Sequence, residues 1–559
     1  MKPPATREAG KGRRGETNMR GLMQDWPLLC HRVIDHAAIY HGERKVVSRS
    51  IEGPVVTTTY AAIRQRALKV AQRLDRDGIR PGDRVATLAW NTARHLETWY
   101  GILGIGAIYH TVNPRLFPEQ IAWIVNHAED RLVFADATFV PLLEKLSDKL
   151  PRIERLIVLT DAAHMPQTRL AEAVPYEEWL AEADGDFAWR SFDENTAAGM
   201  CYTSGTTGNP KGVVYSHRSN VLHAMTASRA DALGMSSLDI IMPIVPLFHA
   251  NGWSLAFSAP MAGAALVMPG MRLDGAAVYE MLTAHKVTCS AAVPTVWLML
   301  LQYLEANGGA LPDLRRVVIG GSACPRAITQ KFQDKYGVEV IHAWGMTEMS
   351  PIGTICTLKP EYAALTGEAR LDIQQKQGHP PFGVEMRIED DAGHPVLWDG
   401  KSFGRLKVRG PAVARAYFKE QADILDHDGF FDTGDVATMD RHGYMQITDR
   451  SKDVIKSGGE WISSIELENL AVSHPEVAEA AVIGVRHPRW DERPLLVAVR
   501  KPGETLTKDE LLAFMRGKVA DWWLPDDIVF VDEIPHTATG KVQKAMLRDR
   551  FKEYRLPSA

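Results

Sequence analysis

The chain repeats one pattern of apolar and polar positions over much of its length. A short run rich in Val, Ile and Ala ends in small or polar residues, and apolar positions at helical spacing follow it. Four segments show the pattern: DRVATLAWNTARHLETWYGIL, VTCSAAVPTVWLMLLQYL, LRRVVIGGSACPRAITQKF and VEVIHAWGMTEMSP. They predict strands that lead into helices, as in a parallel sheet, where ligands bind beyond the carboxyl ends of the strands. We expect the residues after these runs to line a cleft: Gly320, Gly321, Ser322, Trp344 and Thr347.

The pattern changes near residue 380. From about Pro380 to Ile447, short apolar runs alternate with glycine turns, which predicts antiparallel β-structure in a barrel-like subdomain. Ser463 and Glu466 then have the spacing of a helix capping box, and the remaining runs indicate a small α+β unit. We therefore predict an α/β protein with three parts: a disordered extension over 1–25, a large N-terminal domain of two α/β subdomains plus the barrel-like one over 26–449, and a small C-terminal domain over 450–559.

Composition limits the classes of partner. The 559 residues are 45% hydrophobic and 24% charged with a net charge of -5, values typical of a globular protein with more than one core. This charge gives no reason to expect nucleic acid or an anionic membrane as a partner. The longest apolar stretch, near Cys289 to Leu301, contains Pro294 and is too short to span a bilayer.

Cysteine usage and the N-terminus indicate where the protein resides. The five cysteines are far apart and form no C-x-x-C pair, so they predict no disulfide or zinc site, and a reducing, cytoplasmic location fits them. The first 19 residues are polar and basic without an apolar core, which excludes a secretory signal. Whether translation starts at Met1 or Met19 stays open.

The segment Tyr202 to Val214, YTSGTTGNPKGVV, combines glycines, hydroxyl residues and one lysine, as a loop around phosphate oxygens requires. It is not the familiar G-x-x-x-x-G-K-[ST] loop, because Asn209 and Pro210 separate Gly208 from the lysine and Gly212 replaces the final hydroxyl. A glycine-rich surface loop is the alternative.

Four further motifs follow in order: WGMTE (344–348), FDTGD (431–435), DRSKDVIKSGGEWIS (449–463) and TATGKV (537–542). With YTSGTTGNPKGVV they resemble the adenylate-forming (ANL) superfamily of acyl-CoA synthetases, luciferases and nonribosomal peptide adenylation domains, over about residues 30 to 550. The resemblance implies that ATP and a carboxylic acid form an acyl-adenylate, which coenzyme A then converts to a thioester.

The resemblance also implies roles for single residues. Lys541, Glu348 and His249 are the catalytic candidates, and Glu348 with Thr203 would hold Mg2+, because oxygen ligands suit this hard cation. Contacts to ATP and coenzyme A are implied for Thr203, Ser204, Gly205, Thr206, Thr207, Gly208, Lys211, Gly321, Ser322, Ala323, His342, Trp344, Gly345, Met346, Thr347, Asp435, Ile447, Arg450, Lys456, Gly458, Gly459, Glu460 and Trp461.

Each role has a purely structural alternative. Glu348 alone fits a carboxylate at a helix start, Lys541 a surface lysine, and Asp435 a turn. The indole of Trp344, where many relatives have tyrosine, would stack on adenine or pack in the core. Lys456 to Gly459 alone fits a strand-to-helix turn.

Two half-reactions need two arrangements of one site. The family rotates its C-terminal domain about a hinge, which corresponds to Lys452 here. The rotation would withdraw Lys541 and bring KSGGEW to the cleft, where Gly458 and Gly459 leave room for the pantetheine arm.

The substrate is expected to be an uncharged aliphatic acid. The stretch from Ile241 to Met271 contains no Asp, Glu, Lys or Arg, so a charged tail would find no partner there. His249 and Trp253 interrupt this run, and with Gly320 they are the candidate substrate contacts. The local pattern resembles bacterial medium- and long-chain fatty acyl-CoA ligases and methylthiopropanoate-CoA ligases, and a thioether is too similar to a methylene for the sequence to separate them.

Three functions account for some or all of these motifs. An acid:CoA ligase that releases AMP and diphosphate explains all five motifs, and its partners are small molecules. An acyl-AMP ligase that loads a separate carrier protein is the second, and a nucleotide-binding switch that releases ADP is the third. The sequence leaves a homodimer open.

Overall fold

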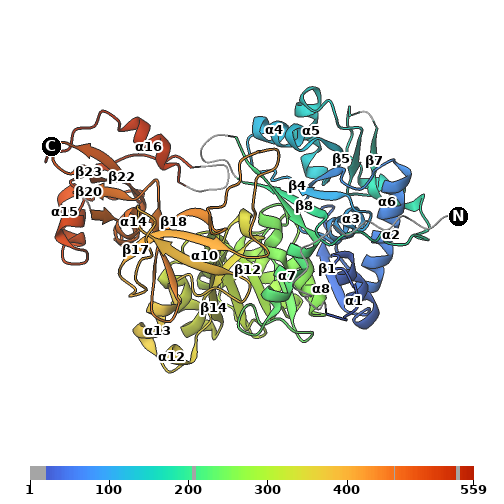
Figure 1. Cartoon of the computed structure of the whole chain (residues 1–559), viewed down its shortest axis with the longest axis horizontal. Helices are drawn as coiled ribbons and strands as arrows, with labels where there is room; N and C mark the ends of the chain where they lie inside the picture. The colour runs from blue at the N-terminus through green and yellow to red at the C-terminus, as the bar shows by residue number, and fades with distance from the viewer. Residues whose placement is uncertain (1–20, 171, 204–208, 459, 537–541) are drawn as a thin grey trace, which may run out of the picture.

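The computed structural model describes residues 21–170, 172–203, 209–458, 460–536 and 542–559. Two large α/β units form most of the molecule, and a four-stranded sheet follows them. The C-terminal unit lies at the end of the molecule opposite α2 (Tyr60–Arg76) and α6 (Tyr176–Ala181) (Figure 1). Among the described residues, no helix is both long and apolar enough to cross a membrane.

The first large sheet has seven strands in the order β7-β6-β5-β3-β4-β8-β9. All neighbours are parallel except β8 and β9, which form an antiparallel pair. The strands are β3 (Arg84–Leu88), β4 (Ile108–Thr111), β5 (Asp130–Ala135), β6 (Arg155–Val158), β7 (Ala173–Pro175), β8 (Ala197–Tyr202) and β9 (Gly212–Ser216).

The second large sheet has eight strands in the order β15-β14-β13-β12-β10-β11-β1-β2. Its edge pairs β1–β2 and β14–β15 are antiparallel and its interior pairs are parallel. The strands are β1 (Lys45–Arg49), β2 (Val55–Thr59), β10 (Ile240–Pro243), β11 (Ala265–Met268), β12 (Cys289–Ala292), β13 (Arg316–Ile319), β14 (Glu339–Gly345) and β15 (Ile352–Ile355).

Helices cover these sheets, and one buried apolar cluster joins them. The cluster takes Val85 and Tyr109 from the first sheet and Val46, Ile241 and Leu266 from the second. Burial on this scale is the main stabilising contribution, at about 25 cal/mol per Å² of apolar surface. The helices are α1 (His31–Tyr40), α2 (Tyr60–Arg76), α3 (Ala93–Gly104), α4 (Pro118–Ala128), α5 (Val140–Leu146), α6 (Tyr176–Ala181), α7 (His217–Ser228), α8 (Leu255–Met261), α9 (Gly275–Ala284), α10 (Pro294–Asn307), α11 (Arg326–Gln330), α12 (Pro360–Ala363) and α13 (Gly367–Gln374).

Three of the four predicted strand–helix segments are confirmed, as β3–α3, β12–α10 and β13–α11. The fourth prediction is wrong. After β14 the chain forms a single 3₁₀ turn, Thr347–Met349, and returns as the antiparallel strand β15. Ser350 adopts a left-handed φ of 70°, and Pro351 has no N–H to continue a helix, so the chain reverses there.

The predicted antiparallel region is a four-stranded sheet in the order β16-β17-β18-β19: β16 (Glu385–Glu389), β17 (Phe403–Arg409), β18 (Phe431–Met439) and β19 (Met445–Arg450). The predicted α+β unit follows, with its own sheet β21-β20-β23-β22 and β24 paired to β23. Its elements are β20 (Ile455–Ser457), β21 (Glu460–Ile462), α14 (Ser464–Val472), β22 (Val477–His487), β23 (Asp491–Arg500), α15 (Lys508–Met515), β24 (Asp527–Phe530) and α16 (Lys544–Arg550). Ser463 caps α14 by accepting a hydrogen bond from the Glu466 N–H (3.2 Å), as expected.

Candidate active site

The predicted phosphate loop lies between β8 and β9. Its ends are joined by two hydrogen bonds: Thr203 N–H donates to the Lys211 carbonyl (2.9 Å), and Lys211 N–H donates to the Thr203 hydroxyl (3.1 Å). Ser204, Gly205, Thr206, Thr207 and Gly208 lie outside the described residues. The described ends thus form a closed loop base at the end of a parallel strand, the position where such sheets bind ligands.

Glu348 lies in the 3₁₀ turn after β14 and is buried. The Tyr215 hydroxyl donates to the Thr347 carbonyl (2.7 Å), which connects this turn to the strand that leaves the phosphate loop. The Tyr417 hydroxyl donates to Glu348 Oε1 (2.7 Å). The structure therefore joins the turn that carries Glu348 to the strand that leaves the loop, and the Mg2+ role of Glu348 stays a prediction.

Sequence reasoning missed Tyr215 and Tyr417. Tyr417 lies 69 residues from Glu348, in a loop whose local pattern, ARAYFKEQ, marks no site. Only its aromatic side chain within a polar loop distinguishes it. Tyr215 stands in an apolar run and looks like an ordinary buried strand residue.

The predicted ribose site is formed by β14, β18 and β19. Asp435 is buried on β18, and its Oδ1 binds the Arg450 guanidinium at 2.9 Å from the neighbouring strand β19. Its Oδ2 accepts a hydrogen bond from Trp344 Nε1 (3.1 Å). Asp435 and Arg450 thus lie together as predicted, and their ribose-binding role stays a prediction. Ile447 lies half-buried on β19.

Trp344 is largely buried, and its ring packs on Gly353 of β15, where an added Cβ would meet ring carbons at 2.3 Å. The ring carbons of the indole therefore pack in the core, as one of the two alternatives predicted. The indole N–H donates to Asp435, a hydrogen bond that the sequence did not predict. Stacking on adenine stays a prediction. Gly345, Met346 and Thr347 follow Trp344 directly at the strand end.

The candidate acyl residues also lie together. A Cβ placed on Gly320 would meet Trp253 Cη2 at 3.0 Å, and one on Gly321 would meet Trp253 Cζ2 at 4.0 Å. Gly320 directly follows β13, so its lack of a side chain lets the indole reach the strand end. Gly321, Ser322 and Ala323 are exposed beyond it.

A left-handed turn carries Trp253. Residues Ala250 to Ser254 all have positive φ, between 35° and 65°, although only Gly252 lacks a side chain. Such conformations cost about 1 kcal/mol or more for each ordinary residue, so other contacts must hold them. Asn251 makes two such contacts, both hydrogen bonds. Its Oδ1 accepts from the Thr111 hydroxyl (2.8 Å), and its Nδ2 donates to the Tyr109 hydroxyl (3.3 Å).

Two further candidate residues are histidines. His249 is half-buried directly before the left-handed turn, and its N–H donates to the Pro246 carbonyl (3.1 Å). His342 on β14 is buried, and burial lowers its pKa to about 4. Its Nδ1–H donates to the Gln375 carbonyl (3.1 Å). His342 is therefore neutral at physiological pH and cannot supply positive charge for phosphates.

The KSGGEW segment forms the hairpin β20–β21, in which Ile455 pairs with Ile462. It rests on the four-stranded sheet: Lys456 Nζ lies 3.1 Å from Asp391 Oδ2, and the Trp461 ring stacks on Phe403 with 5.6 Å between centroids. Gly458 has a φ of 60°, and a Cβ there would meet Trp490 at 2.9 Å.

Several predicted residues are not tested by this geometry. Lys452, the predicted hinge, is exposed between β19 and β20. Gly459 and Lys541 lie outside the described residues, and only the backbone of Glu460 is described. The roles of these four residues stay predictions.

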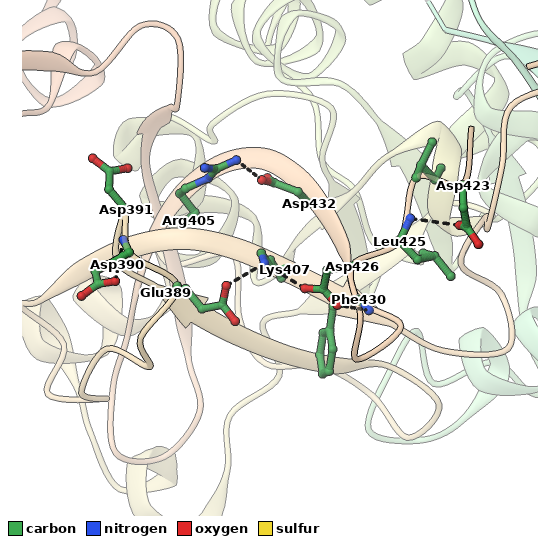
Figure 2. A pocket seen from close by; sticks show the side chains of 13 residues that line it. Glu389, Asp390, Asp391, Arg405, Lys407, Asp423, Leu425, Asp426, Phe430 and Asp432 are labelled. Carbon is green, nitrogen blue, oxygen red and sulfur yellow. Dashed lines mark hydrogen bonds and ion pairs between the residues drawn. The ribbon is translucent and has the colours of Figure 1, made fainter. Parts of the chain in front are cut away.

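A charged pocket of about 440 Å³ lies elsewhere, on the four-stranded sheet. Figure 2 shows Lys407 between Glu389 (2.6 Å) and Asp426 (2.8 Å). Although burial opposes it, the hydrogen bond from Lys407 holds the pKa of the Asp426 carboxyl well below its usual range. Six acidic and two basic residues line this pocket, so it disfavours the phosphates of ATP or coenzyme A.

Comparison with known proteins identifies the family. Residues 34–418 match the AMP-binding enzyme family, and residues 466–541 match the AMP-binding enzyme C-terminal domain. The chain is 50% identical to 3-methylmercaptopropionyl-CoA ligase of Ruegeria pomeroyi, over 96% of this chain and 99% of that protein. It is 45% identical to the medium-chain-fatty-acid–CoA ligase of Ectopseudomonas oleovorans, over 97% of this chain and 99% of that protein.

A solved structure agrees with these sequence matches. The anthranilate CoA ligase AuaEII, in complex with anthranoyl-AMP, matches with a TM-score of 0.82 and 26% identity over 95% of this chain and 98% of that chain. The loop base, the buried glutamate and the Asp435–Arg450 pair thus stand in a fold that binds an acyl-adenylate in a relative. The chain belongs to the AMP-binding enzyme family and is an adenylate-forming acyl-CoA ligase.

Proposed function

We propose that this ligase activates an uncharged, medium-chain aliphatic acid. In the first step a carboxylate oxygen of the acid bonds to the α-phosphorus of ATP and diphosphate leaves. In the second, the sulfur of coenzyme A bonds to the acyl carbon and AMP leaves. The observation that carries the proposed acid is the contact of Trp253 with Gly320. Trp253 lies within a stretch, Ile241 to Met271, that contains no charged side chain of Asp, Glu, Lys or Arg.

The nucleotide would lie along the strand ends. The Asp435–Arg450 pair would hold the ribose, the indole of Trp344 would border the adenine, and the loop between Thr203 and Lys211 would surround the phosphates. Preorganised donors are what such a transfer needs, because charge develops on the leaving diphosphate. Lys541 would reach the reacting oxygens.

Glu348 and Thr203 would hold Mg2+. The donor set fits this ion, because a carboxylate and a hydroxyl are hard oxygen ligands. Glu348 is buried, with one oxygen already hydrogen-bonded, so its carboxylate is held in one orientation. When bound, the ion would neutralise charge on the phosphates.

We also propose two domains, 26–449 and 450–559, that rotate about Lys452 between the half-reactions. In support, β19 ends at Arg450 within one sheet and β20 begins at Ile455 within another. The contacts from Lys456 to Asp391 and from Trp461 to Phe403 would break on rotation. We place the reaction in the cytoplasm, where ATP and coenzyme A are both present.

Two alternatives remain, one for the acid that is activated and one for the acceptor of its acyl group. The name of the Ruegeria pomeroyi relative supports 3-methylmercaptopropionate, whose thioether has nearly the polarity of a methylene. Loading of a separate carrier protein is the other.

A panel of acids tests the proposal. AMP release is measured with ATP, coenzyme A and each acid from acetate to octanoate, with methylthiopropanoate beside pentanoate. Each added methylene should raise kcat/KM about fourfold until the pocket is full. Acetate or an amino acid as the best substrate would overturn the proposed acid, and release of ADP would overturn the reaction. AMP release without free coenzyme A, but with a carrier protein, would favour the second alternative.

A further inference from the structure

The loop that follows β17 reaches the phosphate site. The part of this loop that makes the contacts is the segment of residues 412–420. Ala414 N–H donates to the Glu348 carbonyl (2.7 Å), and Phe418 N–H donates to the Gly212 carbonyl (2.8 Å). The segment therefore joins the turn that carries Glu348 to the strand that leaves the phosphate loop.

Tyr417, in the middle of this segment, directs its hydroxyl at the carboxylate of Glu348, with 2.7 Å between the oxygens. The phenolic O–H is therefore the donor to Oε1, because an ionised carboxylate only accepts hydrogen bonds. Glu348 is only 6% exposed, so this bond lies away from solvent.

The ring of Tyr417 makes a second contact. Lys211 Nζ lies over it, 4.5 Å from the centroid, and also lies 3.5 Å from the exposed Glu420. The Lys211 side chain is 46% exposed, so few other groups limit its motion. A cation over an aromatic face is attracted to the ring, which restricts the ammonium group to the side of the loop base.

We propose that Tyr417 is a positioning residue for the first half-reaction: its hydroxyl orients the carboxylate of Glu348, which would hold Mg2+, and its ring holds Lys211 at the base of the phosphate loop. The inference rests on the proposed function, because it assumes that Glu348 and Lys211 act on MgATP. In this proposal Tyr417 acts through Glu348 and Lys211, and not by contact with ATP or the acid. Residues that orient a metal ligand typically change metal affinity or activity about 10- to 100-fold when removed.

Tyr417→Phe removes the hydroxyl and keeps the ring. We expect MgATP binding, measured by calorimetry without acid, to weaken about tenfold. We also expect the Mg2+ concentration for half-maximal acid-dependent diphosphate exchange to rise by a similar factor. Thioester formation from supplied acyl-adenylate should keep its wild-type rate, because that step uses neither ATP nor the metal.

Tyr362→Phe is the matched control. Tyr362 is also a half-buried tyrosine that donates to a carboxylate, Asp440 Oδ2 at 3.0 Å, but it lies outside the proposed site. It should leave MgATP binding and the Mg2+ dependence unchanged. Tyr417→Leu removes both contacts and should bind MgATP a further few-fold more weakly than Tyr417→Phe.

A double variant separates orientation from general stability. If Tyr417 acts through Glu348, Tyr417→Phe should have little additional effect on MgATP binding in a Glu348→Gln background. Wild-type MgATP binding and Mg2+ dependence in Tyr417→Phe would overturn the inference, as would an equal loss in both half-reactions. The wild-type enzyme shows whether the inference about Tyr417 or the proposed function has failed. A wild-type enzyme that releases no AMP with any acid refutes the function itself.

Discussion

Trp344 Nε1 and Asp435 Oδ2 lie 3.1 Å apart, so the indole N–H donates to the carboxylate that also binds Arg450. Both oxygens of Asp435 are therefore engaged in a buried place where β14 meets β18. Charge-assisted bonds of this kind hold a carboxylate in one orientation. The proposed ribose acceptor is thus set before any nucleotide arrives.

Trp344→Phe should weaken ATP binding without affecting the acid. The substitution keeps an aromatic ring but removes the N–H, and a hydrogen bond to a charged group contributes about 1.5–3 kcal/mol. We expect the KM for ATP to rise about tenfold and the KM for the acid to stay the same, by steady-state kinetics. The exposed Trp398→Phe serves as control. An unchanged KM for ATP would contradict a role for this hydrogen bond at the nucleotide site.

Trp253→Ala should change the preference for chain length. Removing the indole opens space beside Gly320, so the kcat/KM maximum should move toward longer acids, while hexanoate loses about tenfold or more because its contacts are gone. The acid panel measures this shift, with the exposed Trp522→Ala as control. A uniform loss over all acids, with the maximum unmoved, would mean that the indole does not border the acyl chain.

Lys541→Ala should separate the half-reactions. An ammonium group that neutralises charge in the first transition state contributes several kcal/mol there, so acyl-adenylate formation should fall at least 100-fold. Coenzyme A should still consume supplied acyl-adenylate at close to the wild-type rate. Lys552→Ala, an exposed lysine in the same domain, is the control. Equal loss of both steps in a folded protein would argue against domain rotation.

Protonation of His223 should destabilise the fold in acid. Burial lowers its pKa from 6.5 to about 3, and its Nε2 accepts a hydrogen bond from Ile352 N–H (3.0 Å) at the start of β15. Below pH 6.5 the folded state binds fewer protons at His223 than the unfolded state does. The contribution of neutral His223 to the free energy of unfolding is therefore complete above pH 6.5 and is lost as the pH falls toward 3. Between pH 6.5 and 4 the loss is about 3 kcal/mol.

His223→Gln tests that loss, because the amide oxygen accepts the same bond and does not titrate. Urea unfolding at pH 6.5 and pH 4 should show a smaller difference in midpoint for this variant than for the wild type. His394→Gln, at an exposed histidine, should keep the wild-type difference. If His223→Gln were as acid-sensitive as the wild type, His223 would be excluded as a source of the loss of stability in acid.

The sequence predicted those features that a local pattern encodes. Strand–helix alternation indicated the two large sheets, and glycine turns indicated the four-stranded one. Ser463 at capping spacing marked the start of α14. The ordered motifs also singled out Asp435 and Arg450, which the structure brings into contact, and Glu348, while the roles of all three stay predictions.

Contacts between distant residues could not be read from local patterns. Tyr417 meets Glu348 across 69 residues, and Trp344 meets Asp435 across 91. Both depend on how the four-stranded sheet packs against β14. The reversal after Gly345 was missed because the apolar run there has the same pattern as the true strand–helix units.

The proposed acyl contact Trp253 lies in the left-handed turn at 250–254, so the proposal makes substrate choice depend on residues far away in the chain. Its unfavourable backbone is anchored by Thr111 and Tyr109 of β4, in the seven-stranded sheet, while the turn itself follows β10 of the eight-stranded sheet. The turn is therefore a strained backbone segment that hydrogen bonds hold in place where the two large sheets meet. Small displacements of β4 would therefore be transmitted to the Trp253 ring, and acid selectivity would respond to substitutions that never touch the acid.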